Sequence, residues 1–215
     1  AFNDTLTGNN LANVLDGGAG NDTLTGGSGI DRFTVGSGTD TISDLGNGGA
    51  DILTVAAGAI ANATINTAWT ATSASVNSGT ANITTNGLAV NLAAVTSGNG
   101  FSVTNTGVAA TLTGSSGADT LTGGTDADTL DGGAGNDTLT GGAGIDTASY
   151  ASAASAVTVN LATTTAQATG GAGSDILATI ENLTGSAFND TLTGNASVNI
   201  LYGGQGNDTL TGGAG

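Results

Sequence analysis

Large apolar residues recur at every ninth position in parts of the chain, each between two polar residues. One such run is Leu15, Leu24, Phe33 and Ile42. A polar, apolar, polar triplet rich in threonine predicts a short strand whose central side chain points into a core. Glycine-rich segments of six residues separate the triplets and predict tight turns. Because one turn and one strand take nine residues, two repeats would complete one coil of a solenoid, and every second repeat would stack.

The turns follow a nonapeptide pattern. GGAGNDTLT at 17–25 returns as GGSGIDRFT at 26–34, as GGAGNDTLT at 132–140 and as GGQGNDTLT at 203–211. In this G-G-x-G-x-D-x-U-x pattern, where U is the large apolar residue, glycine permits the backbone conformations of a tight turn. The turn carbonyls and the aspartate would face inward, and oxygen ligands of this kind suit a hard cation such as calcium. The sequence therefore predicts calcium sites in the turns.

These repeats make the chain resemble the repeats-in-toxin (RTX) family. The resemblance implies an all-β fold, a right-handed parallel β-roll or β-helix solenoid with several calcium ions (Ca2+) in its turns, which fold the chain when they bind. It also implies secretion by a type I system of a Gram-negative bacterium, and therefore an extracellular or cell-surface location. Within this family, the chain resembles secreted S-layer and adhesin proteins.

We expect one continuous solenoid that is a fragment of a longer chain. Its calcium-binding blocks should span residues 1–54, 114–149 and 170–215. Aspartate is absent from residues 55–113, where alternating apolar residues predict a metal-poor continuation of the solenoid or an insert. Residues 150–169 are expected to form a strand insert between two blocks.

The candidate metal ligands are the aspartates at the sixth position of the repeats and the turn glycines. The aspartates are Asp4, Asp22, Asp31, Asp40, Asp51, Asp119, Asp128, Asp137, Asp146, Asp175, Asp190 and Asp208. The glycines are Gly17, Gly18, Gly20, Gly26, Gly27, Gly29, Gly117, Gly132, Gly133, Gly135, Gly141, Gly142, Gly144, Gly203, Gly204 and Gly206.

The repeat spacing also predicts which of these residues stack. The expected stacks are Asp4 with Asp22 and Asp40, Asn13 with Asp31 and Asp51, Asp119 with Asp137, Asp128 with Asp146, and Asp190 with Asp208. Asn13 and Asn199 occupy sixth positions without a charge. Sites beside these two asparagines should therefore bind calcium less tightly.

The charge balance favours a cation as the ligand. The chain has 17 acidic residues and one basic residue, Arg32, which gives a net charge of -16. Nucleic acid and anionic lipid are not expected partners, because both require basic residues. A flexible acidic linker is the alternative interpretation, but a linker would not hold a large apolar residue at regular intervals. Without calcium the stacked carboxylates should repel each other and leave the chain largely disordered.

Catalysis is not expected. The chain has no histidine and no cysteine, so it lacks the usual general base and the usual activated nucleophiles. The aspartate pairs are explained by the turn pattern. We therefore expect no enzyme activity, no catalytic residue and no cofactor other than calcium. No apolar run approaches ~20 residues, so no transmembrane segment is predicted.

Trp69 is the only tryptophan, in a segment rich in threonine and alanine. It fits a local core plug or cap, and a platform on which a ligand stacks is the alternative. The plug is the interpretation that we favour.

Two functions are compatible with the sequence. The first is an extracellular structural protein, such as an S-layer subunit, a filament subunit or an adhesin stalk. Its partners would be copies of itself in a homopolymer or lattice, with cell-surface polysaccharide as a further candidate. Residues 1–29 realign with residues 187–215. This similarity indicates either simple drift within a common repeat, or a tandem module or end-to-end stacking. The alternative function is a folding and secretion module of an exported enzyme or toxin.

Overall fold

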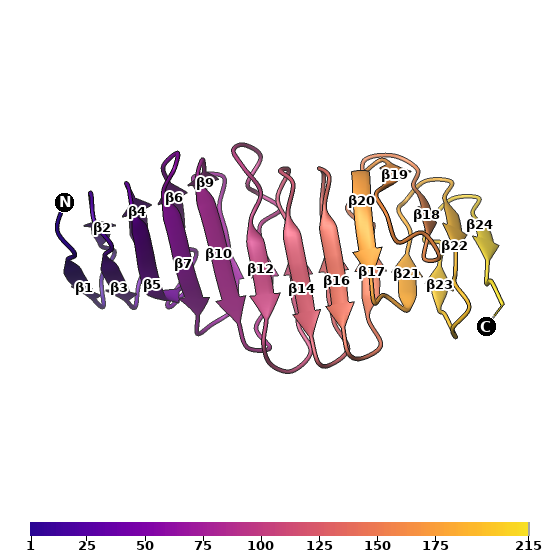
Figure 1. The fold of residues 1–215 in the computed structure, drawn as a ribbon, viewed down its shortest axis with the longest axis horizontal. Coiled ribbons are helices and arrows are strands. Elements are labelled where there is room, and N and C mark those ends of the chain that lie inside the picture. Colours follow the sequence, from indigo (N-terminus) through magenta and orange to yellow (C-terminus); the bar gives the residue numbers. More distant parts are fainter. Residues whose placement is uncertain (215) are drawn as a thin grey trace.

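The computed structural model describes residues 1–214, which form 24 short strands and no helix. The strands lie side by side along one long row of coils, with the two termini at opposite ends (Figure 1). Neighbouring strands of the row run parallel almost throughout. The predicted all-β fold, a parallel solenoid, is therefore confirmed.

Four sheets make up the coils. The long sheet contains, in spatial order, β1 (Thr5–Asn9), β3 (Thr23–Gly27), β5 (Thr39–Leu45), β7 (Ile60–Ile65), β10 (Thr80–Thr85), β12 (Ser102–Asn105), β14 (Thr120–Gly124), β16 (Thr138–Gly142), β20 (Gly173–Ala178) and β19 (Gln167–Gly170). A four-stranded sheet contains β2 (Val14–Asp16), β4 (Arg32–Val35), β6 (Ile52–Val55) and β9 (Val76–Asn77).

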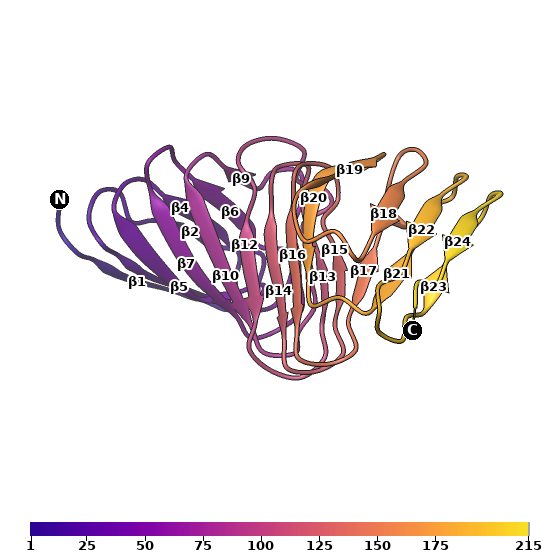
Figure 2. The same cartoon turned by 45° about the vertical axis from the view of Figure 1, so that its right-hand side comes forward.

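The other two sheets are formed later in the chain. The seven-stranded sheet contains β8 (Trp69–Thr70), β11 (Val90–Asn91), β13 (Thr111–Thr113), β15 (Thr129–Asp131), β17 (Thr147–Ser149), β21 (Asn182–Thr184) and β23 (Leu201–Tyr202). The three-stranded sheet contains β18 (Thr158–Asn160), β22 (Thr191–Thr193) and β24 (Thr209–Thr211). Figure 2 shows these three strands beyond β20, at the end that carries the C-terminus.

The strand register follows the nonapeptide period. Leu6 pairs with Leu24, and Leu121 pairs with Leu139, so the partners are 18 residues apart. Two nine-residue repeats therefore complete one coil, as the spacing predicts. Equivalent turn residues consequently lie directly above one another, and this stacking positions the candidate metal ligands.

The coils of the metal-poor segment are longer. Ile60 pairs with Thr80, and Asn82 pairs with Ser102, at a spacing of 20 residues. The coil that begins with β7 contains a third strand, β8, before β9. β7, β10 and β12 nevertheless continue the long sheet, so this segment is part of the same solenoid.

The segment 150–169 leaves the coil and returns. Leu139 in β16 pairs with Leu177 in β20, although these residues are 38 positions apart. Within the excursion, β18 begins the three-stranded sheet, and β19 runs antiparallel to β20. The excursion therefore contains strands, and β19 departs from the parallel order of the coils.

The core lies between the sheets. The apolar residues of the repeats, such as Leu24, Phe33, Ile42 and Leu121, are completely buried. Complete burial of such a side chain stabilises the fold by roughly 1.5–3 kcal/mol. None of the residues that the structure describes belongs to a helix that is long and apolar enough to span a membrane.

Candidate metal sites in the turns

Stacked aspartates form a column where the chain enters the long sheet. Oδ1 of Asp22 accepts a hydrogen bond from the backbone N–H of Asp4 at 2.8 Å. Oδ1 of Asp40 accepts one from the backbone N–H of Asp22 at 3.0 Å. Asp4 and Asp22 immediately precede β1 and β3, and Asp40 is the second residue of β5, because the sixth position of the repeat ends the turn. The predicted stack of these three residues is present.

The other predicted stacks have the same geometry. Oδ1 of Asp31 accepts the N–H of Asn13, and Oδ1 of Asp51 accepts the N–H of Asp31, both at 2.8 Å. The same bond joins three further pairs, in which the carboxylate of the second residue accepts the N–H of the first. These pairs are Asp119 with Asp137 at 2.8 Å, Asp128 with Asp146 at 2.8 Å and Asp190 with Asp208 at 2.9 Å.

Three apolar residues interrupt the column of the long sheet. Asp40 pairs with Ala61, and Ala61 pairs with Ala81. Phe101 follows in the same register, and its N–H donates to Oδ1 of Asp119 at 2.6 Å. The interrupting residues are all buried. Aspartates therefore occupy this column on both sides of an apolar stretch.

Six of the stacked aspartates keep one carboxylate oxygen without a partner. Oδ2 is buried and has no hydrogen-bond partner among residues 1–214 in Asp22, Asp31, Asp40, Asp128, Asp137 and Asp146. A buried carboxylate oxygen is costly unless a donor or a cation compensates it. Burial, followed by the charges of Asp175 and Asp119, raises the pKa of Asp137 to about 8. These oxygens are therefore suited to a positive ligand.

Glycine makes room for a cation beside these oxygens. A Cβ at Gly123, the first residue of its turn, would lie 2.6 Å from Oδ2 of Asp128 and 2.5 Å from the carbonyl oxygen of Gly141. A side chain at this position would therefore fill the space between a carboxylate oxygen and a backbone carbonyl of the next coil. Oxygen atoms of these two kinds are the ligands that calcium prefers. The residues present fit a calcium ion.

The predicted glycines, which do not include Gly123, also shape the turns. Gly133 and Gly135 have φ angles of +86° and +135°, which residues with a side chain rarely adopt. Gly17, Gly26, Gly132, Gly141 and Gly203 lie against the carboxylate of their own turn, as Gly123 does. Gly117 differs, because it packs against Gly100 of the preceding coil.

Carboxylates alone cannot hold the ions. No cluster of three or more acidic, histidine or cysteine side chains suited to a metal occurs in the described part of the chain. Ligands must therefore come from both the aspartates and the backbone carbonyls of the turns. Asp4 is the predicted aspartate whose side chain is exposed. Its part in a metal site would require another group to cover this coil.

Two acidic residues outside the predicted set also take part. Oε2 of Glu181 accepts the N–H of Asp146 at 2.9 Å, so this glutamate continues an aspartate column. Its sequence Glu181-Asn182-Leu183-Thr184 has the acid and the apolar residue at motif spacing, which could have identified it. Asp44 accepts the N–H groups of Gly26 and Gly27 at 2.9 and 2.7 Å.

Asp175 was predicted as a ligand, but without a stacking partner. Its Oδ1 accepts the N–H of Asp137 at 3.0 Å, across the excursion of residues 150–169. Thr169 in the excursion donates to Oδ2 of Asp175 at 3.0 Å. The buried Tyr150 lies near the same carboxylate, and burial raises the pKa of its hydroxyl. The excursion therefore supplies polar groups to this column.

Trp69 is a core residue. Its side chain is completely buried, and its indole nitrogen donates to a backbone oxygen. The interpretation of Trp69 as a core plug is confirmed.

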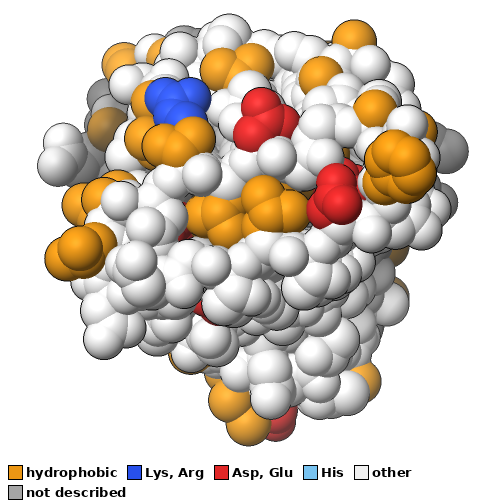
Figure 3. All heavy atoms as spheres, turned by 90° about the vertical axis from the view of Figure 1, so that its left-hand side faces the viewer, with side chains coloured by type: hydrophobic (Ala, Val, Ile, Leu, Met, Phe, Trp, Pro, Cys, Tyr) orange, Lys and Arg blue, Asp and Glu red, His pale blue; other side chains and the backbone are white. Residues whose placement is uncertain are grey.

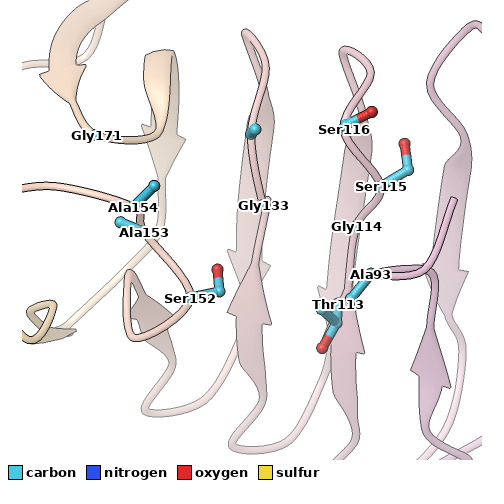
Figure 4. Close-up of a pocket in the computed structure, with 11 residues that line it drawn as sticks. Ala93, Thr113, Gly114, Ser115, Ser116, Gly133, Ser152, Ala153, Ala154 and Gly171 are labelled. Atoms are coloured by element: carbon cyan, nitrogen blue, oxygen red, sulfur yellow. The ribbon is translucent and has the colours of Figure 1, made fainter. Parts of the chain in front are cut away.

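A shallow hollow of about 230 Å³ lies between the coils and the excursion (Figure 4). Ser115 and Ser116 line one side, and Ser152, Ala153 and Ala154 line the other. Its lining, in the part of the chain described, consists of alanine, glycine, serine and threonine. This hollow offers no charged group to a ligand.

Comparisons with known proteins agree with this geometry. A family model described as the RTX calcium-binding nonapeptide repeat matches in four copies, over residues 7–42, 113–148 and 181–215. No curated protein sequence matches the chain. The matched residues contain stacked aspartates on both sides of the apolar interruption, among them Asp22, Asp40, Asp119 and Asp137, whereas Asp4, Asp51 and Asp175 lie outside the matched ranges. The chain therefore belongs to the family of RTX calcium-binding nonapeptide-repeat proteins.

Proposed function

We propose that the chain is a calcium-folded solenoid that serves as a structural element outside the cell. The observation that carries this proposal is the set of six buried carboxylate oxygens without a partner. In the metal-free chain these aspartates raise the free energy of the fold by desolvation and mutual repulsion. Calcium removes both costs, so its binding energy becomes folding energy. Extracellular calcium would then switch the aspartate-containing blocks of the chain from disordered to folded.

The acidic residues support a structural role rather than a catalytic one. Their carboxylates accept backbone N–H groups within the columns, and Asp137 is one example between two coils. A carboxylate held in this way by the fold is not free to act as a general base on a substrate. We accordingly propose that the chain has no enzyme activity of its own. Its nearest functional class would be an S-layer subunit, a filament subunit or an adhesin stalk exported by a type I system.

The repeated end segments support self-association. Asp190 and Asp208 are joined as Asp4 and Asp22 are. The N–H of Asn195 donates to Oδ1 of Asn199 at 2.8 Å, and the matching pair, Asn9 and Asn13, has the same bond at 2.7 Å. Residues 1–29 and 187–214 therefore share local structure as well as sequence. Such equivalence suits a module that recurs in a tandem array or stacks on a copy of itself.

The face near the N-terminus supports the same partner. Figure 3 shows apolar side chains spread over this face, with little basic surface. Phe2, Leu11 and Val14 are among the exposed apolar residues. β1 and β2 are edge strands of their sheets here. Unpaired strand edges of this kind can pair with a like strand of a second copy. Cell-surface polysaccharide is a second candidate partner.

The test compares the purified protein in chelator and in millimolar calcium. Circular dichroism should report β-structure that increases strongly with calcium, and light scattering and electron microscopy should then reveal ordered assemblies. Equal β-structure in both conditions would contradict calcium-conditional folding. A protein that folds with calcium but stays monomeric at high concentration would contradict self-assembly, and would favour a folding and secretion module of an exported enzyme or toxin.

A further inference from the structure

The stacked acidic turns fall into two classes. In the open class, Oδ2 of the aspartate has no partner among the described residues, as in Asp22, Asp31, Asp40, Asp128, Asp137 and Asp146. In the closed class, donors from the protein already occupy Oδ2. The closed aspartates are Asp51, Asp119, Asp175 and Asp190.

Two closed turns use a serine in the second position. The N–H and Oγ of Ser115 donate to Oδ2 of Asp119 at 2.7 and 2.9 Å. The N–H of Ser186 donates to Oδ2 of Asp190 at 2.6 Å, and its Oγ donates to Oδ1 at 2.7 Å. Both serines are buried. Hydrogen-bond donors of the same turn therefore compensate the negative charge of each carboxylate, as a bound cation would otherwise do.

Open turns with glycine in the second position direct this N–H elsewhere. The N–H of Gly133 donates to Oδ1 of Asp131, two residues earlier, at 3.0 Å. The N–H of Gly18 makes the same bond to Asp16 at 3.0 Å. The N–H of the second residue is thus turned away from the aspartate at position six. Oδ2 of Asp137 and Oδ2 of Asp22 remain free as a result.

Backbone conformation explains the difference. Gly133 and Gly18 have positive φ angles of +86° and +75°, whereas Thr179 is the only described residue other than glycine with a positive φ. A serine in the second position avoids the left-handed region because its side chain makes that region costly. Its N–H then points at the acid four residues later, as the bond from Ser115 to Asp119 demonstrates.

Asparagine in the second position gives the same closed geometry. The N–H of Asn9 donates to Oδ1 of Asn13 at 2.7 Å, and the N–H of Asn195 donates to Oδ1 of Asn199 at 2.8 Å. Both turns also replace the charged residue at position six by asparagine. Closure by the second residue and loss of the charge therefore occur together in these turns.

We infer that, in turns whose carboxylate no other segment closes, the second turn residue decides whether the turn binds calcium. Glycine in this position leaves the carboxylate open to the ion, and serine or asparagine replaces the ion with donors of the protein. Asp51 and Asp175 stand outside this rule, because Gly46 and Thr169 close them from other positions. Asp119 is the first aspartate of its column after the apolar interruption by Ala61, Ala81 and Phe101. The turn of Asp119, which starts this part of the column, would therefore hold no calcium ion. This inference rests on the proposed calcium binding of the open turns.

The experiment removes the closing serine. Ser115→Gly allows the left-handed conformation and frees Oδ2 of Asp119, so the folded protein should bind about one more calcium ion than the unchanged chain. Ser115→Ala is the matched control, because it removes the hydroxyl but keeps a residue that avoids positive φ. Its calcium count should stay unchanged. Isothermal titration and elemental analysis of the desalted, folded protein measure the count, and circular dichroism verifies folding.

Three further variants keep the inference falsifiable if Ser115→Gly does not fold. Ser186→Gly should also add about one ion, through Asp190. Asp137→Asn, in an open turn, should lower the calcium count, whereas Asp119→Asn, in a closed turn, should leave it unchanged. Equal counts for the unchanged chain and both glycine variants would overturn the inference. Failure of the unchanged chain to bind calcium would instead overturn the proposed function.

Discussion

The indole N–H of Trp69 donates to the backbone carbonyl of Asp51, with Nε1 and O 3.0 Å apart. Trp69 begins the seven-stranded sheet, and Asp51 is the last residue of the stack that starts at Asn13. The N–H of Gly46 donates to Oδ2 of Asp51 at 2.7 Å. The stack therefore ends at Asp51. Its backbone carbonyl contacts the buried Trp69, and its carboxylate accepts hydrogen bonds from the protein.

Substitution of Trp69 should measure this contact. Trp69→Phe keeps most of the buried area but loses the hydrogen bond, which should cost about 1 kcal/mol of unfolding free energy. Trp69→Ala also leaves a cavity and should cost roughly 3–5 kcal/mol. Urea unfolding in saturating calcium, followed by circular dichroism, measures both. The exposed Ser73→Ala is the control and should change stability by less than about 0.5 kcal/mol. Equal stability of Trp69→Ala and the control would contradict the plug.

Asp22→Ala should raise the calcium concentration needed for folding. Asp22 lies in the middle of its column, where it accepts from Asp4 and donates to Asp40. Its removal deletes a charge-assisted hydrogen bond, worth about 1.5–3 kcal/mol, together with a metal ligand. A calcium titration followed by circular dichroism gives the midpoint. Asp126→Ala is the control, because it removes the same charge from an exposed turn position. Identical midpoints for the two variants would refute the role of the column.

Hydrogen exchange in chelator should separate the middle of the solenoid from its flanks. Asn82 donates to Asn62 at 2.8 Å between two coils of the metal-poor segment, and Ile83 is buried beneath them. Because these coils contain no aspartate, they should keep their protection without calcium. The blocks 1–54 and 114–149 should exchange rapidly. Mass spectrometry of peptides measures this pattern, with the calcium-bound protein as the reference. Uniform exchange along the metal-free chain would contradict the prediction.

Acid should stabilise the metal-free fold. Burial raises the pKa of Asp137 to about 8 and that of Asp51 to about 6, from an ordinary value of 3.8. The folded chain therefore binds these protons more tightly than the unfolded chain does. The stabilisation is complete below about pH 4 and is lost as the pH rises through 6 and then 8. Calcium needs the ionised carboxylates, so calcium affinity should change in the opposite direction.

Circular dichroism of the metal-free protein at pH 5 and pH 8 measures this effect. The β-signal should be stronger at pH 5, and the calcium midpoint should be lower at pH 8. The variant Asp137→Asn stays neutral at both values and serves as the comparison. Its metal-free fold should depend less on pH than that of the unchanged chain. A metal-free β-signal that is stronger at pH 8 would contradict the assigned burial of these carboxylates.

The repeat pattern was sufficient to predict the stacking inside each block. Asp22 and Asp40 are 18 residues apart with no insertion between them, so counting alone identifies them as neighbours. The buried apolar positions follow from the same count, as Leu24 and Leu121 illustrate. In such segments local turn geometry determines which residues lie above one another. Sequence and structure therefore agree there.

Counting fails where the coil length changes. Asp175 stacks on Asp137, and Glu181 on Asp146, only because the excursion of residues 150–169 leaves the coil and returns. No periodicity specifies where such an excursion rejoins the sheet. Closure of Asp119 by Ser115 was also missed, because the pattern describes which residues are present and not the direction of a backbone N–H.

The apolar stretch of Ala61, Ala81 and Phe101 has a consequence for cooperativity. In a solenoid each coil interacts only with its neighbours, so occupancy of one ion site favours the next site through a shared coil. Three rows without a carboxylate break this succession between Asp40 and Asp119. The two halves of the molecule would respond to calcium as separate cooperative units, each with its own threshold. A single chain would then respond to calcium in two separate concentration ranges.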